Sequence, residues 1–145
     1  MNKYIIIAIV AAVLIGAGFG FSKIKKPSEN VVESTGKEVH ITIRAVKNEW
    51  RWDIENVKVN AGDMVHLTLI NEDDYDHGIG LEGYGINERM PAKGTTTIEF
   101  VAKRKGKFVF YCSVPCGKGI VANPKSPFDG QERDHFDMLG TLEVI

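Results

Sequence analysis

The chain contains two cysteines, Cys112 and Cys116, and three more soft or borderline metal donors stand around them in the sequence. His77 lies upstream, and His135 and Met138 follow downstream, three residues apart. Thiolate and thioether sulfurs are soft ligands and imidazole is borderline, so this mixture suits copper better than magnesium, calcium or manganese. One cysteine, two histidines and a weak methionine would make a mononuclear blue copper site. With the second cysteine, two thiolates could instead bridge two copper ions that each take one histidine, a rigid arrangement suited to fast electron transfer.

Other chemistries could use the same residues. Cys112 and Cys116 could form a plain disulfide if the domain is exported to an oxidising compartment. A zinc site would use the same cysteines and histidines, but methionine is a poor zinc ligand and no catalytic Glu-His pattern is present. The sequence has no nucleophile–base pair or paired carboxylates that would indicate a hydrolase. The formal net charge of −1 gives no basic excess, so we expect no nucleic-acid partner.

The elements that must position these donors are β-strands. Apolar and polar residues alternate with period two, and the segments end at turn signals around Gly62, Gly94 and Gly106. The apolar phases are Val39, Ile41, Ile43 and Ala45; Val65, Leu67 and Leu69; Thr96, Ile98 and Phe100; Phe108, Phe110 and Cys112; and Leu142 and Val144. Several short strands at this spacing predict an all-β Greek-key sandwich or barrel, in which loops at strand ends can converge at one pole.

The amino-terminal part has a different character. No charged residue occurs from Tyr4 to Phe21, a stretch just long enough to span a bilayer. It shows no clean small-x-small cleavage pattern, so we expect a retained single transmembrane helix over residues 1–24 rather than a removed signal peptide. Residues 25–36 read as a flexible linker, and residues 37–145 as one domain. Lysines after the helix would place this domain inside the cell, whereas the proposed chemistry favours the extracytoplasmic face.

The motifs resemble those of a known family. From about Lys47 to Ile145 the chain is similar to subunit II of haem–copper cytochrome c oxidases, whose cupredoxin domain holds the dinuclear copper centre Cu-A, also found in nitrous oxide reductase. Its single expected helix resembles the short subunit II of ba3-type oxidases. The likeness rests on Trp50 and Trp52, Val59-Asn60-Ala61-Gly62-Asp63, Asp76-His77-Gly78, Met90-Pro91, Gly106-Lys107-Phe108, Cys112-Ser113-x-x-Cys116-Gly117 and His135-x-x-Met138-x-Gly140.

The resemblance implies a ligand set and one departure from the family pattern. It implies side-chain ligands at His77, Cys112, Cys116, His135 and Met138, with the backbone carbonyl of Val114 as a further ligand. The family normally has three residues between the second cysteine and the second histidine, and that position holds Ile120 here. We interpret residues 121–134, which contain Asn123-Pro124, Ser126-Pro127 and Asp129-Gly130, as a surface loop inserted into the metal-binding loop. The ligands could still meet, because longer loops add closure entropy only slowly.

The function implied is that of an electron-transfer subunit. It would accept electrons from cytochrome c or a similar donor at two copper ions and pass them to the catalytic subunit of a membrane-bound haem–copper oxidase, without a substrate-converting site of its own. One alternative is a stand-alone, membrane-anchored cupredoxin that shuttles electrons or carries copper, with one ion. Another is a structural domain with a disulfide and no metal.

Several residues have more than one interpretation. We expect His40 and His66, at polar phases of their strands, to be surface residues. Trp50 and Trp52 are read as core residues, with an edge for electron uptake as the alternative. The acidic run Glu72–Asp76 is read as a solvated loop that could also steer a basic donor.

Overall fold

The computed structural model describes residues 33–145. They form ten β-strands and two single 3₁₀ turns. In order these are β1 (Glu38–Ala45), β2 (Asn56–Val59), β3 (Met64–Asn71), β4 (His77–Leu81), η1 (Glu82–Tyr84), β5 (Ile86–Met90), β6 (Thr95–Val101), β7 (Gly106–Tyr111), β8 (Lys118–Ile120), β9 (Glu132–Asp134), η2 (His135–Asp137) and β10 (Leu139–Val144). In this described range no helix is long and apolar enough to cross a membrane. The expected helix over residues 1–24 and most of the expected linker lie outside the described residues.

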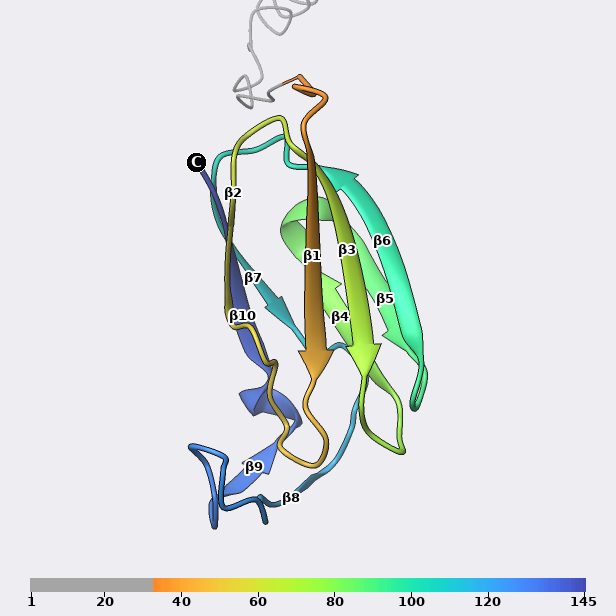
Figure 1. The fold of residues 1–145 in the computed structure, drawn as a ribbon, viewed down its shortest axis with the longest axis vertical. Helices are drawn as coiled ribbons and strands as arrows, with labels where there is room; N and C mark the ends of the chain where they lie inside the picture. The colour runs from red at the N-terminus through yellow and green to blue at the C-terminus, as the bar shows by residue number, and fades with distance from the viewer. Residues whose placement is uncertain (1–32) are drawn as a thin grey trace, which may run out of the picture.

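The strands form two main layers that face each other (Figure 1). One sheet has the order β1-β3-β6, and the other has the order β2-β10-β7-β4-β5. β1 pairs with β3 in parallel and β2 pairs with β10 in parallel, while the other pairings within these two sheets are antiparallel. The prediction of an all-β sandwich is therefore confirmed.

The core lies between the two sheets and follows the predicted alternation. In β3, Val65, Leu67 and Leu69 are buried while the residues between them are partly exposed. Ile43 faces Leu69 across the parallel β1–β3 pair, and both are almost fully buried. Burial of these aliphatic side chains contributes about 25 cal/mol for each Å² removed from water, so the sheet faces are held together mainly by this layer.

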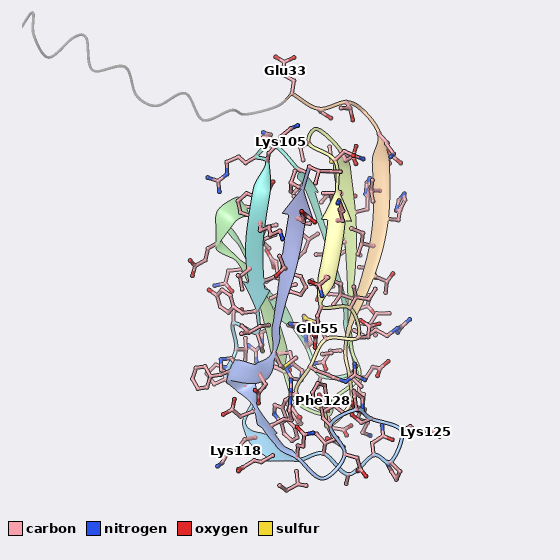
Figure 2. The ribbon with its side chains drawn as sticks, turned by 90° about the vertical axis from the view of Figure 1, so that its left-hand side faces the viewer. Glu33, Glu55, Lys105, Lys118, Lys125 and Phe128 are labelled. Carbon is pink, nitrogen blue, oxygen red and sulfur yellow. The ribbon has the colours of Figure 1, made fainter. Side chains whose placement is uncertain are left out.

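β8 and β9 form a small separate hairpin at one end of the sandwich. They pair antiparallel, with Lys118 opposite Asp134 and Ile120 opposite Glu132. Figure 1 places this hairpin at the end of the molecule opposite to the carboxyl terminus. Figure 2 shows the same polarity, with Lys118, Lys125 and Phe128 at one end and Glu33 and Lys105 at the other.

Candidate metal centre

The six predicted ligands come from loops and strand ends at the pole that carries the β8–β9 hairpin. His77 opens β4, Cys112 directly follows β7, and Val114 and Cys116 lie in the connection to β8. His135 opens the turn η2, and Met138 lies between that turn and β10. Segments far apart in the sequence therefore meet here, and the structure brings all six predicted residues together.

One group of donors surrounds the sulfur of Cys112. His77 Nδ1 lies 3.5 Å from Cys112 Sγ, and the carbonyl oxygen of Val114 lies 3.2 Å from the same sulfur. Gly78 allows the cysteine loop to lie close to β4, because a Cβ at position 78 would lie 2.5 Å from Ser113 Oγ. His77 and Cys112 are both buried.

A second group surrounds the sulfur of Cys116. His135 Nδ1 lies 3.6 Å from Cys116 Sγ, and Met138 Sδ lies 3.7 Å from it. Met138 is fully buried. Each cysteine thus has one imidazole nitrogen and one weak donor beside it.

The two sulfurs lie 3.8 Å apart, and both cysteines are free. A disulfide bond would require about 2.0 Å, so the structure does not contain the predicted alternative of a disulfide. Metal–thiolate bonds are about 2.3 Å long, and two sulfurs that share one ion must therefore lie within about 4.6 Å of each other. The observed separation meets this condition, and soft thiolates with imidazole and thioether donors fit copper.

Asp73 fixes the orientation of His77. Its Oδ2 lies 2.8 Å from His77 Nε2, and its Oδ1 accepts a hydrogen bond of 2.7 Å from the backbone N–H of Asn48. A carboxylate at Nε2 favours a proton on that nitrogen, so Nδ1, which lies beside Cys112, is the nitrogen that would lose its proton and bind a metal. Asp73 and His77 are both fully buried, so water does not compete for this contact.

The buried groups perturb one another strongly. Burial alone would lower the pKa of His77, but its contacts with Asp73 and Cys112 outweigh this effect and raise the pKa to about 9. The contact between the two thiols lowers the pKa of Cys112 and raises that of Cys116. Cys112 is therefore the thiol that ionises first. Strongly perturbed pKa values are a feature of functional sites, where buried groups interact with charged neighbours.

The β8–β9 hairpin explains how His135 reaches the centre despite its distance from Cys116 in sequence. The two strands carry the chain away and back again, so that His135 N–H donates a 3.0 Å hydrogen bond to the carbonyl of Gly117. Asp134 then caps the turn η2 by accepting from Phe136 N–H. Ile120, at the family's usual histidine position, is 60% exposed and does not point into the centre.

Sequence reasoning missed a buried carboxylate that holds the inserted segment. Glu49 is 1% exposed and accepts hydrogen bonds from Asn123 Nδ2 and Ser126 Oγ, each 2.6 Å long, and from Arg51 Nε at 2.7 Å. Burial would raise the pKa of Glu49, but the hydrogen bonds from Ser126, Arg51 and Asn123 together lower it. Glu49 stands in a polar turn after β1, and no local sequence pattern separates it from an ordinary exposed glutamate.

Trp50 packs against the same hairpin. Its indole N–H donates to the carbonyl of Cys116 at 3.1 Å, and a Cβ at Gly119 would lie 2.6 Å from the indole ring. Its backbone has a φ of 45°, a rare conformation for a bulky residue. Trp50 and Trp52 are both buried core residues, as predicted, and Trp50 also contacts the backbone of the cysteine loop.

The acidic run departs from the expected solvated loop at Asp73, whereas Asp74 is exposed as expected. Asp73 is fully buried, and the others make specific contacts: Asp76 pairs with Arg89 and accepts from Ala92 N–H, while Asp74 lies 3.3 Å from both Lys47 and Lys93. The only feature of the sequence that could have indicated the role of Asp73 is its position four residues before His77. The paired lysines and arginine also reduce the negative charge available for steering.

No protein-family profile matches the chain. Nitrous-oxide reductase from Ralstonia nicotianae is 32% identical over 95 residues, which is 63% of this chain and 14% of that protein. The enzyme from Cupriavidus necator is 31% identical over 96 residues, or 15% of its length. The chain thus spans about a seventh of the length of these curated relatives.

Solved structures share the architecture at low sequence identity. Reduced auracyanin from Roseiflexus castenholzii superposes with a TM-score of 0.54 and 19% identity, covering 76% of this chain and 99% of that one. A chain of a haem–copper terminal oxidase dimer superposes with a TM-score of 0.55 and 17% identity, covering 98% of this chain and 93% of that one. At these identities the likeness is one of fold. The described part of the chain is therefore a cupredoxin-like β-sandwich with a buried cluster of sulfur and imidazole donors at one pole.

Proposed function

We propose that the chain is a copper-binding electron-transfer protein with a dinuclear Cu-A-type centre. His77, Cys112, Cys116, His135 and Met138 would hold the ions through side chains, and Val114 through its backbone carbonyl. When bound, such a copper pair accepts and releases one electron. The protein supplies a rigid cradle, since the ligands come from strand ends and one tightly capped turn.

The observation that carries this proposal is the division of donors between the two sulfurs. A mononuclear site would gather one cysteine, both histidines and the methionine around one sulfur. Instead, His77 lies beside Cys112, and His135 lies beside Cys116. The two half-sites meet across a sulfur pair 3.8 Å apart, an arrangement that favours two ions with shared thiolates.

We further propose that the chain acts as subunit II of a haem–copper oxidase and passes electrons to its catalytic subunit. The motif resemblance supports this role, and so does the chain of a haem–copper terminal oxidase that matches nearly the whole length of this one. Nitrous-oxide reductases share the sequence likeness but are several times longer.

Cytochrome c or another small redox protein would deliver the electrons outside the cytoplasm, with the chain held by a single amino-terminal membrane helix. An exposed aromatic surface lies next to the centre, because Phe136 is 79% exposed and its ring contacts that of His135 at 5.1 Å. The described chain begins at Glu33, at the pole opposite to the centre (Figure 2). A tether at that pole would leave the metal pole accessible to a donor.

Copper stoichiometry combined with EPR spectroscopy of the purified full-length chain tests the proposal. We expect two copper ions per chain and a mixed-valence signal split by two equivalent copper nuclei. One ion with an intense blue band would overturn the dinuclear assignment and favour a stand-alone cupredoxin. A chain with no copper affinity would indicate a structural domain.

Co-purification tests the oxidase role separately. The chain isolated under mild detergent conditions from its native membrane should carry a haem-containing partner. A chain that binds two copper ions but elutes without haem would be an independent electron carrier.

A further inference from the structure

A second cluster of metal donors lies on the outer face of the three-stranded sheet. His40 in β1 lies directly opposite His66 in β3, and His66 lies opposite Glu99 in β6. Glu38 precedes His40 by two residues and therefore points to the same face. Glu38 and His40 lie in the first half of β1, whereas the candidate metal centre is at the pole where β1 ends (Figure 1).

The donor atoms are close enough to share an ion. Glu38 lies 3.8 Å from His40 Nε2 and 4.0 Å from His66 Nε2, and one donor atom from each of the three residues falls within 4.8 Å of the others. Two ligands of a tetrahedral ion at about 2.1 Å lie about 3.4 Å apart, so Glu38 must approach both imidazoles more closely, and the two rings must turn out of their stack, to bind one ion. The imidazole rings stack with centroids 4.6 Å apart and an interplanar angle of 15°.

Glu99 prepares His66 for this role. Its Oε1 lies 2.9 Å from His66 Nδ1, which favours the proton on Nδ1 and leaves a lone pair on Nε2. His66 Nε2 is shielded from solvent and has no hydrogen-bond partner within the described residues. The carboxylate of Glu38 lies 4.0 Å from His66 Nε2, which is beyond hydrogen-bond distance. The ion pair with Glu38 therefore does not satisfy this nitrogen.

We propose that Glu38, His40 and His66 bind a divalent transition-metal ion of the zinc–copper class, with Glu99 as the residue that orients His66. Imidazole and carboxylate ligands suit Zn²⁺ and Cu²⁺ rather than Ca²⁺ or Mg²⁺. Three protein ligands leave the remaining position to water. The side chain of His40 is 72% exposed and that of Glu38 is 64% exposed, so an ion reaches these two ligands directly from solvent. Nε2 of His66 is shielded and becomes accessible when the stacked ring of His40 turns aside.

Titration with Zn²⁺ of the full-length chain whose cysteine centre is already filled with Cu⁺, followed by NMR of the histidine ring nitrogens, tests this site separately from the cysteine centre. We expect the Nε2 signals of His40 and His66 to shift together at one equivalent. His66→Ala and His40→Ala should each weaken that binding at least tenfold, and Glu99→Gln should weaken it by about 10-fold. Thr42→Ala, a neighbour on the same face of β1, is the matched control and should leave the affinity unchanged.

Zinc that shifts only His77 and His135, or an affinity unaffected by either histidine variant, would overturn the proposal. All these substitutions are at positions that are exposed or partly exposed, and unchanged circular dichroism will verify the fold. The Cys112→Ser variant should retain the zinc-induced shifts of His40 and His66, because the two sites share no ligand.

Discussion

Asp73 and His77 form a fully buried pair whose chemistry depends on charge as well as shape. Both carboxylate oxygens are used, one by His77 Nε2 and the other by Asn48 N–H. An asparagine at position 73 would have only one oxygen for these two donors, so one donor would face an amide NH₂ group. Carboxylates behind a metal-binding histidine contribute to affinity by fixing the ring and raising its basicity.

We therefore expect Asp73→Asn to lower copper affinity by about 10–100-fold. Competition with a chromophoric copper chelator measures this change. Asp74→Asn is the matched control, because Asp74 is the adjacent acid but is exposed. Equal affinities of the two variants would show that Asp73 does not support the centre.

His135 is the proposed ligand whose place in the sequence departs most from the family pattern. His135→Ala should abolish the mixed-valence EPR signal, because one half-site would lose its only imidazole. His66→Ala removes a histidine from the outer sheet face and should leave that signal intact. A mixed-valence spectrum that survives in His135→Ala would mean that another residue supplies the second nitrogen.

At the scale of elements, the β8–β9 hairpin carries the insertion and Glu49 secures it to the sandwich. The hairpin pairing places His135 beside Gly117. The hydrogen bonds from Asn123 and Ser126 to Glu49 hold the segment between β8 and β9 against the sandwich. The insertion is therefore an ordered part of the metal pole. Its position is set by a buried carboxylate rather than by hydrophobic packing alone.

Glu49→Gln should lower the free energy of unfolding at pH 7 by about 1–3 kcal/mol, since donors to a charged acceptor would lose their partner. The pKa of Glu49 is lowered in the folded protein, so its contribution is present above the unfolded value of about 4.3 and is lost as pH falls through the folded value. The difference between wild type and variant should therefore shrink below about pH 4. Urea denaturation at pH 7 and at acid pH measures both effects.

Glu132→Gln provides the control for this prediction. Glu132 is in the same hairpin and lies 2.7 Å from Lys118, but both side chains are more than half exposed. Exposed ion pairs contribute about 0–1 kcal/mol, so this variant should be nearly neutral at both pH values. Equal losses in the two variants would mean that Glu49 does not anchor the hairpin.

At the scale of the whole molecule, the proposed centre joins strand ends that belong to one sheet with the inserted hairpin. Copper bound at this point would hold β4, β7 and β10 together through their loops. A ligand that binds only the folded state stabilises it by mass action, by about 2.7 kcal/mol at one hundred times its dissociation constant.

Copper should accordingly raise the melting temperature of the full-length chain by roughly 10 °C under those conditions. Differential scanning calorimetry with and without copper measures the shift. Cys116→Ser, which removes the sulfur shared by His135 and Met138, should lose most of this increase. An undiminished increase would place the stabilising copper elsewhere, for instance at the histidine pair of the outer sheet.

The positions of the main strands and the chemical types of the donors can be read from the amino-acid sequence. Alternation along 64–71 and 38–45 specified which face of each strand is buried, because side chains in a strand point to opposite faces in turn. Soft-metal chemistry is also indicated by residue type alone, since ligand softness is a property of the side chains of Cys112, Cys116, His135 and Met138.

The way in which these donors meet depends on the folded chain. Three features depend on contacts between segments distant in sequence: the hydrogen bond of His135 to Gly117, the burial of Asp73 and the hydrogen bonds to Glu49. Ser126 and Glu49, for example, are 77 residues apart. Local periodicity carries no information about such pairs, because it reports the environment of one strand and not its neighbours in space. The division of the donors between two sulfurs is likewise a property of the closed fold.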